Sequence, residues 1–218
     1  FNNSGWNGGS FSWSGLYYAG PQYAQMRYEF GSKDGISGGI AVENLNYQTT
    51  YMPNVVGRLT YGAAWGTVGI AGAYDPDRNG AAAGEDDTFS VEGAIKLNVP
   101  SMPGSAFKVM GWYNSAYTDD YSNGTPFAAG ATPKWSVLAS FLYQATPDLG
   151  LIVSGQYFSN AYAVGTNDVV DDTSAWAAEV SAVWTPVKNF EIRPEIVYQK
   201  AKGLDGTVSG YLRFTRSF

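Results

Sequence analysis

The sequence predicts an all-β fold, an antiparallel up-and-down transmembrane β-barrel, and three observations lead to this prediction. Apolar and polar residues alternate with a period of two along most of the chain. The alternating segments are about 10–12 residues long, which exceeds the usual globular strand and matches a tilted span of a bilayer. The connections alternate between short and long, as they do when short turns gather on one rim of a barrel and long loops on the other.

The alternation is clearest between Phe89 and Val99. Odd positions there are apolar or glycine, whereas even positions include Ser90, Glu92 and Lys96. Because successive side chains of a strand point to opposite faces, this segment has one apolar and one polar face. We count eleven strands of this kind, over residues 21–30, 36–46, 54–64, 66–75, 87–98, 105–116, 134–145, 149–160, 173–185, 189–200 and 207–218.

The connections between these strands fall into two classes. The tight ones are Gly31–Gly35, Trp65–Gly66, Val99–Gly104, Thr146–Asp148 and Pro186–Lys188. The long ones, rich in Gly, Asn, Asp and Pro, are Tyr47–Pro53, Pro76–Asp86, Tyr117–Pro133 and Ala161–Asp172. A soluble β-sandwich has no reason to sort its loops in this way, so the sorting favours a barrel that crosses a membrane.

Aromatic residues of the apolar face gather near the strand ends. The group near the short turns, which we predict to form an aromatic girdle, consists of Phe30, Trp65, Tyr143, Trp184, Phe190 and Phe218. The group nearer the long loops consists of Tyr113, Trp135, Tyr157, Trp176 and Tyr198. Trp and Tyr rings are stable at the headgroup level of a bilayer, where an apolar body and a polar edge are both satisfied. Two such bands are expected of a membrane-spanning barrel.

The composition excludes several classes of function. The 218 residues contain no Cys and no His, which removes thiol chemistry, imidazole acid–base catalysis and most transition-metal sites. The net charge of -6 leaves no basic stripe for nucleic acid. Glu191 and Glu195 share a strand face but lie about 13 Å apart along an extended chain, too far for the carboxylate pair of a glycosidase. We therefore predict no enzyme, no catalytic residue, no cofactor and no metal.

The polar face is predicted to line a water-filled interior, where its charges would act on passing solutes. The predicted basic pore-lining residues are Arg27, Arg58, Lys96, Lys108, Arg193 and Arg213. The predicted acidic ones are Glu29, Glu43, Glu92, Glu179 and Glu195, with Asp75 and Glu191 on the same face. Opposed charges across a narrow point would orient polar solutes. The alternative interpretation is that most of these charges solvate a wide interior and pair with one another.

Three segments of the chain carry a family resemblance. They are Tyr51–Gly57, which reads YMPNVVG, Tyr61–Asp75 with its Trp65-Gly66 turn, and Arg213–Phe218 with its terminal Phe. On these residues the sequence resembles the general porins of alphaproteobacteria, porin family 2. The resemblance covers most of the chain, although the loops differ.

The resemblance implies a homotrimer of sixteen-stranded barrels in the bacterial outer membrane, each a channel for passive diffusion of small hydrophilic solutes and ions. It also implies that the third loop folds inward as a constriction. Residues 1–20 would be the tail of that loop, and residues 21–218 the sixth to sixteenth strands, so we expect five strands and the start of the loop upstream of Phe1. Arg27 and Arg58 are then the first candidates for the side chains that would produce an electric field across the constriction.

The predicted partners are outer-membrane lipid, lipopolysaccharide and the barrel-assembly machinery, which would bind the last strand through Phe218. Carboxylates of the long loops could bridge lipopolysaccharide through divalent cations, although solvated loop charge is the favoured interpretation; they are Asp75, Asp77, Glu85, Asp86, Asp87, Asp119, Asp120, Asp171 and Asp172. Two other functions stay open: a smaller outer-membrane barrel that acts as a specific channel or adhesin, and a secreted carbohydrate-binding β-sandwich.

Overall fold

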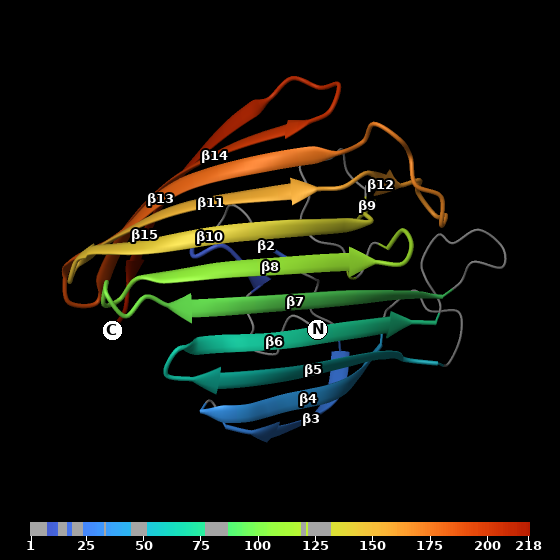
Figure 1. The fold of residues 1–218 in the computed structure, drawn as a ribbon, viewed down its shortest axis with the longest axis horizontal. Coiled ribbons are helices and arrows are strands. Elements are labelled where there is room, and N and C mark those ends of the chain that lie inside the picture. The colour runs from blue at the N-terminus through green and yellow to red at the C-terminus, as the bar shows by residue number, and fades with distance from the viewer. Residues whose placement is uncertain are drawn as a thin grey trace.

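The computed structural model describes residues 8–12, 17–18, 24–32, 34–44, 52–76, 87–118, 121 and 132–218. Eleven long strands form one antiparallel sheet in which each strand pairs with its neighbour along the chain (Figure 1). This confirms the all-β antiparallel fold. A β-sandwich would need two large sheets packed face to face. None of the described segments is a helix with the length and apolar character to cross a membrane.

The observed strands confirm the eleven predicted ones, with ends that differ by a few residues. The long strands are β3 (Ala24–Gly31), β4 (Gly35–Asn44), β5 (Asn54–Ala63), β6 (Gly66–Asp75), β7 (Thr88–Asn98), β8 (Ala106–Asn114), β10 (Trp135–Thr146), β11 (Leu149–Phe158), β13 (Ala175–Val187), β14 (Phe190–Ala201) and β15 (Thr207–Arg216). Sequence alternation did not reveal four two-residue strands, which pair with each other outside this sheet: β1 (Gly8–Gly9) with β2 (Tyr17–Tyr18), and β9 (Thr132–Pro133) with β12 (Ala161–Tyr162).

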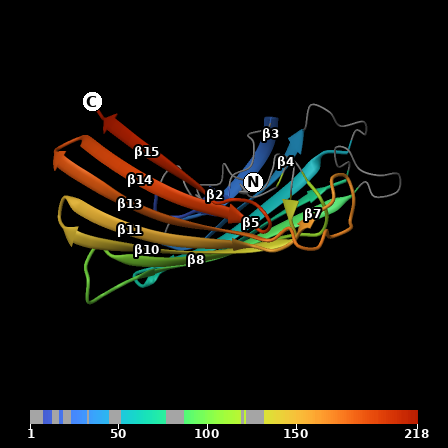
Figure 2. The same cartoon turned by 90° about the horizontal axis from the view of Figure 1, so that it is seen from above.

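The sheet curves into an open trough (Figure 2). It is not closed, because β3 and β15 are the two edge strands. We call its inner side the concave face and its outer side the convex face. On β11, Leu151 and Val153 are exposed on the convex face, whereas Ile152 and Ser154 between them are buried on the concave face. The period of two in the sequence thus becomes two faces of different character.

The polarity of the two faces is inverted relative to a water-soluble protein. Every long strand exposes at least one large apolar side chain: Met26, Ile40, Leu59, Ile70, Phe89, Phe107, Val137, Val153, Val180, Ile196 and Leu212. Several ionisable side chains are buried instead, among them Glu43, Asp75 and Glu179. Soluble domains bury large apolar residues and expose carboxylates. The strands of a membrane barrel alternate apolar outward and polar inward.

The short turns lie together at the left end of the sheet in Figure 1, and the longer connections lie at the other end. Gly66 ends the β5–β6 turn with a φ of 147°, and a Cβ atom there would lie 1.9 Å from the Lys96 carbonyl oxygen. Only glycine fits this position without moving the neighbouring strand. The turn predicted at Pro186–Lys188 lies later in the chain, between Val187 and Phe190. The pairing of β13 with β14 is irregular after Trp184, and β13 continues to Val187.

At the end of the sheet opposite the short turns, the structure describes only some residues of the long connections. Of the predicted long loops, Ala161–Asp172 is fully described, and its β12 pairs with β9 from the preceding loop. The carboxylates Asp77, Glu85, Asp86, Asp119 and Asp120 lie outside the described residues. The β14–β15 connection at this end is short, with only residues 202–206 between the strands.

Candidate functional site on the concave face

The strand register places the predicted charged residues on the concave face. Residues paired directly across antiparallel strands point to the same side of a sheet. One such row runs through Glu29, Gly39, Arg58, Ala71 and Glu92. A second row runs through Lys96, Lys108, Ser140, Ser154 and Glu179. The remaining predicted residues follow from the alternation along β3, β4, β14 and β15.

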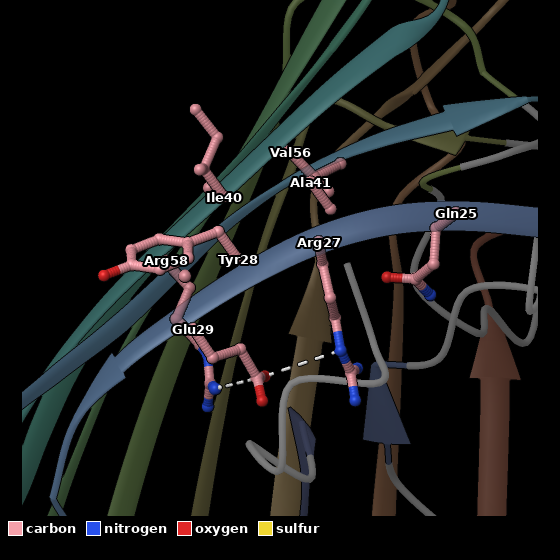
Figure 3. Close-up of a pocket in the computed structure, with 10 residues that line it drawn as sticks. Gln25, Arg27, Tyr28, Glu29, Ile40, Ala41, Val56 and Arg58 are labelled. Atoms are coloured by element: carbon pink, nitrogen blue, oxygen red, sulfur yellow. Dashed lines mark hydrogen bonds and ion pairs between the residues drawn. The ribbon is translucent and has the colours of Figure 1, made fainter.

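Glu29 is the centre of a first charge cluster, formed by β3 and β5. Its carboxylate lies 3.1 Å from the Arg58 Nη2 and 3.8 Å from the Arg27 Nε. Figure 3 shows the three side chains pointing to the same side of the sheet, while Ile40 extends to the other. Arg27 and Glu29 are exposed and Arg58 is half-buried, so water screens these contacts strongly.

Glu191 is the centre of a second cluster at the other edge of the sheet. Its two carboxylate oxygens accept hydrogen bonds of 3.2 Å from the Nε and Nη2 of Arg193, on the same strand. Arg213 on β15 donates from Nη2 to the same carboxylate at 3.0 Å. The paired donors of a guanidinium fit a carboxylate, which makes this contact more specific than a point-charge contact.

Lys96 and Lys108 form a third cluster with Glu92. The two lysines are paired directly across β7 and β8, an arrangement in which like charges repel. Lys108 interacts electrostatically with Lys96 and with Glu92, and Glu92 is buried. Each of the three clusters therefore contains two bases and one acid.

The segment Ser10–Ser12 lies against this face and contacts five strands. Ser10 donates from Oγ to the Glu179 carboxylate at 3.0 Å, and the Phe11 amide donates to the Ser140 hydroxyl at 3.1 Å. Arg193 donates to the Phe11 carbonyl at 3.3 Å. The Nζ atoms of Lys108 and Lys96 lie 4.7 and 6.0 Å from the centre of the Phe11 ring, at the distance of a cation–π contact.

Tyr121 joins the long connection after β8 to the concave face of β4 and β5. Its hydroxyl donates to the Glu43 carboxylate at 2.9 Å and accepts from the Asn54 amide at 3.0 Å. All three side chains are buried. Burial, followed by the nearby charge of Glu43, raises the pKa of Tyr121 well above its usual value, so its phenol stays protonated and continues to donate.

The aromatic residues predicted for two bands lie near the strand ends of the convex face. Phe30, Trp65, Tyr143 and Trp184 are exposed near the short turns, Phe190 is half-buried, and Phe218 is exposed beyond β15. Near the long connections, ring centres lie 5.5 Å apart for Trp135–Tyr157 and 5.0 Å apart for Trp176–Tyr198. Tilted ring pairs at this spacing stabilise each other beyond the area they bury.

The sequence predicted the charged residues of this face but missed several neutral ones that organise it. They are Ser10, Phe11, Asn54, Tyr121, Ser140 and Ser154. Ser140 on β10 and Ser154 on β11 occupy polar positions of the sequence alternation, and this pattern could have identified them as residues of the concave face. Phe11 and Tyr121 lie outside the long strands, where no periodicity marks them. Within the described ranges, no group of three or more His, Cys, Asp or Glu side chains could hold a metal ion.

Comparison with known proteins links this arrangement to one family. The sequence model described as the porin subfamily matches residues 2–214. Porin Omp2b of Brucella suis biovar 1 (strain 1330) and of Brucella abortus (strain 2308) are each 26% identical over 215 residues, which cover 89% of this chain and 51% of the relative. The chain spans about half the length of these curated relatives. No solved structure gives a significant match.

Proposed function

Because the chain belongs to the porin subfamily, we propose that its sheet forms the wall of a water-filled channel in the bacterial outer membrane. Small hydrophilic solutes and ions would diffuse through this channel passively. The convex face would contact lipid, and the concave face, with its charged clusters, would contact water and solutes.

The observation that carries this proposal is the inverted polarity of the two faces. Each of the eleven long strands exposes large apolar side chains on the convex face, while carboxylates lie on the opposite face. Monomeric soluble proteins rarely expose apolar patches larger than a few hundred Å². In a bilayer the same surface is stable, because hydrocarbon replaces water on the apolar side and water fills the polar side.

The finer features of the channel are also proposals. We propose a closed sixteen-stranded barrel, supported by the edge strands β3 and β15, because open sheet edges do not occur in the hydrocarbon region of a membrane. Such barrels would assemble as a homotrimer. The two aromatic bands would lie at the two membrane interfaces. Phe218 would be recognised by the barrel-assembly machinery, and rim carboxylates would lie near lipopolysaccharide.

Residues 1–20, of which the structure describes only 8–12 and 17–18, would contribute to a constriction inside the barrel. The contacts of Ser10–Ser12 with Ser140, Glu179 and Arg193 support this proposal, because they hold the segment against the concave face rather than outside the sheet. Arg27 and Arg58 would add positive charge on the strands that follow this segment.

Liposome swelling with uncharged sugars of increasing size tests the channel and its constriction together. We expect swelling that slows as the sugar grows larger. Phe11→Ala removes a ring from the concave face, so the rate for the larger sugars should rise about two- to ten-fold, the usual range for a change of about 0.4–1.4 kcal/mol in a barrier. Phe89→Ala, which removes an exposed ring from the convex face, is the matched control and should leave the size dependence unchanged.

The swelling rates of the wild-type protein test whether a channel forms. The swelling rates of the variants test whether Ser10–Ser12 narrows it. Liposomes that contain the protein but do not swell in any sugar would contradict the proposed function. Equal size dependence for wild type and Phe11→Ala would contradict the role given to Ser10–Ser12 while leaving the channel intact.

A further inference from the structure

We infer that the convex face binds a phosphate group of an outer-leaflet lipid through Lys200, in a groove between β11, β13 and β14 at the end of the sheet opposite the short turns. These three strands are neighbours in the sheet (Figure 1). The inference rests on the proposed function, which places the convex face against lipid, and it adds the chemistry of one lipid contact.

Lys200 is an exception on an apolar face. It pairs directly with Trp176, which places it on the convex side. Among the convex positions of the eleven long strands that the structure describes, only Lys200 and Arg216 carry a charge. Arg216 lies at the short-turn end, where its Nη1 donates to the Lys188 carbonyl at 3.1 Å. Lys200 is therefore the one charge that these strands present to lipid at the opposite end.

The position of Lys200 along β14 is the level expected for lipid headgroups. It follows Tyr198 by two residues on the same face, about 7 Å farther from the short turns. Tyr198 and Trp176, whose ring centres lie 5.0 Å apart, belong to the aromatic band that we propose for the membrane interface. Lipid phosphates lie just outside the hydrocarbon, and the long stem of a lysine allows its ammonium group to reach them.

A groove beside Lys200 has a lining that suits a headgroup. Its volume is about 220 Å³, and its lining includes Tyr157, Trp176, Lys200 and Lys202. Both rings are exposed on the convex face. Aromatic rings pack against the apolar parts of a lipid, while a lysine ammonium attracts a phosphate as a point charge. The groove thus offers both kinds of contact at one place.

The ammonium group of Lys200 is available for this contact. Lys200 is exposed and forms no hydrogen bond or ion pair with any residue that the structure describes, whereas Lys202 is paired with Asp172. The connections beside the groove, residues 159–174 and 202–206, are described throughout. Their remaining acids are exposed and lie beyond the strand ends; they are Asp168, Asp171 and Asp205.

The acids outside the described residues belong to connections that leave β6 and β8. Three strands separate β8 from β14, which places these two strands about 19 Å apart across the sheet. Salt screens exposed charges over about 10 Å. A headgroup that approaches from the membrane would therefore meet Lys200, on a lipid-facing strand, before the acids of the connections.

Charge complementarity favours a lipid over a second copy of the chain as the occupant. In a dry interface between two copies, the Lys200 ammonium would need a carboxylate partner, because an unpaired buried charge is costly. No convex position of the described long strands carries a carboxylate. A lipid phosphate supplies the negative charge that this face lacks.

Native mass spectrometry of the purified, detergent-extracted protein tests the contact with two probes, bisphosphorylated lipid A and the same lipid without its phosphates. We expect the phosphorylated lipid to bind more tightly. Lys200→Gln should weaken its binding about five-fold, the order for one lysine beside anionic lipid, and should leave the dephosphorylated lipid unaffected. Lys200→Arg keeps the charge and should retain the preference. Lys188→Gln, at an exposed position beside the short turns, is the matched control and should bind as the wild type does.

Each unfavourable outcome removes a different part of the inference. Equal affinity for the two lipids would overturn the phosphate contact, and it is the result expected if a second copy of the chain covers the groove. A preference that Lys200→Gln leaves unchanged, or that Lys188→Gln lowers equally, would contradict the assignment to Lys200. Displacement of the lipid by excess inorganic phosphate would show that the groove recognises free phosphate instead. None of these measurements depends on conductance, so swelling of liposomes with the wild-type protein tests the channel separately.

Discussion

Replacing Val180 by Arg should destabilise the folded protein by about 2–4 kcal/mol in lipid vesicles. Val180 is 53% exposed at the middle of β13, between Trp176 near one end and Trp184 near the other. It pairs with Val153 and Ile196, which are also exposed. In the proposed membrane orientation, an arginine there would lie at the hydrocarbon midplane. Guanidinium titration of the protein folded in phospholipid vesicles measures the change in free energy of unfolding.

The matched control for this substitution is Val187→Arg, on the same strand. Val187 is 56% exposed but is the last residue of β13, beside the short turn. In the proposed orientation an arginine at Val187 would reach the membrane interface, and the expected cost is about 0–1 kcal/mol. If both variants lost less than about 0.5 kcal/mol, as exposed substitutions in water usually do, the convex face would not contact lipid.

Tyr121→Phe should cost about 1–3 kcal/mol of folding free energy, the range for removing one partner from buried hydrogen bonds. The change deletes the donor to Glu43 and the acceptor for Asn54 while keeping the ring. Denaturant unfolding of the two proteins gives the difference. Tyr28→Phe, which alters a ring that is 67% exposed on the convex face, should change the free energy by less than about 0.5 kcal/mol.

Alkaline pH provides a second test of the Tyr121 contact. Burial and the charge of Glu43 raise the pKa of this phenol in the folded protein, whereas an unfolded tyrosine ionises at about pH 10. The contribution of Tyr121 to stability is therefore complete below about pH 10 and declines as the pH rises further, because the unfolded chain then binds fewer protons than the folded one. Tyr121→Phe should show a smaller loss over this interval. Equal alkaline slopes for both proteins would contradict a buried, protonated phenol.

The long strands and their faces could be predicted from the sequence because a strand encodes its faces locally. Alternation in Phe89–Val99 is enough to assign Phe89 to the convex face and Glu92 to the concave face, and the register confirms the strands around them. The end of β13 was misplaced because Pro186 indicated a turn. The irregular pairing after Trp184 accommodates this proline within the strand.

The organisation of the concave face could not be predicted, because its contacts join residues that are far apart in the chain. Tyr121 and Glu43 are 78 residues apart, and Ser10 and Glu179 are 169 apart. No local pattern marks either contact. The sequence also could not separate accessible charges from covered ones, since Glu29 and Glu179 both sit at polar positions of alternating strands and only the fold buries Glu179.

Single-channel recording of the purified, detergent-extracted protein in planar bilayers tests most directly whether this sheet forms the wall of a channel. We predict discrete conductance steps, grouped in threes as expected of the proposed homotrimer. The conductance should scale with the bulk salt concentration, because ions in a water-filled interior would move much as they do in bulk solution. A protein that stays soluble without detergent and adds no conductance to the bilayer would contradict this account.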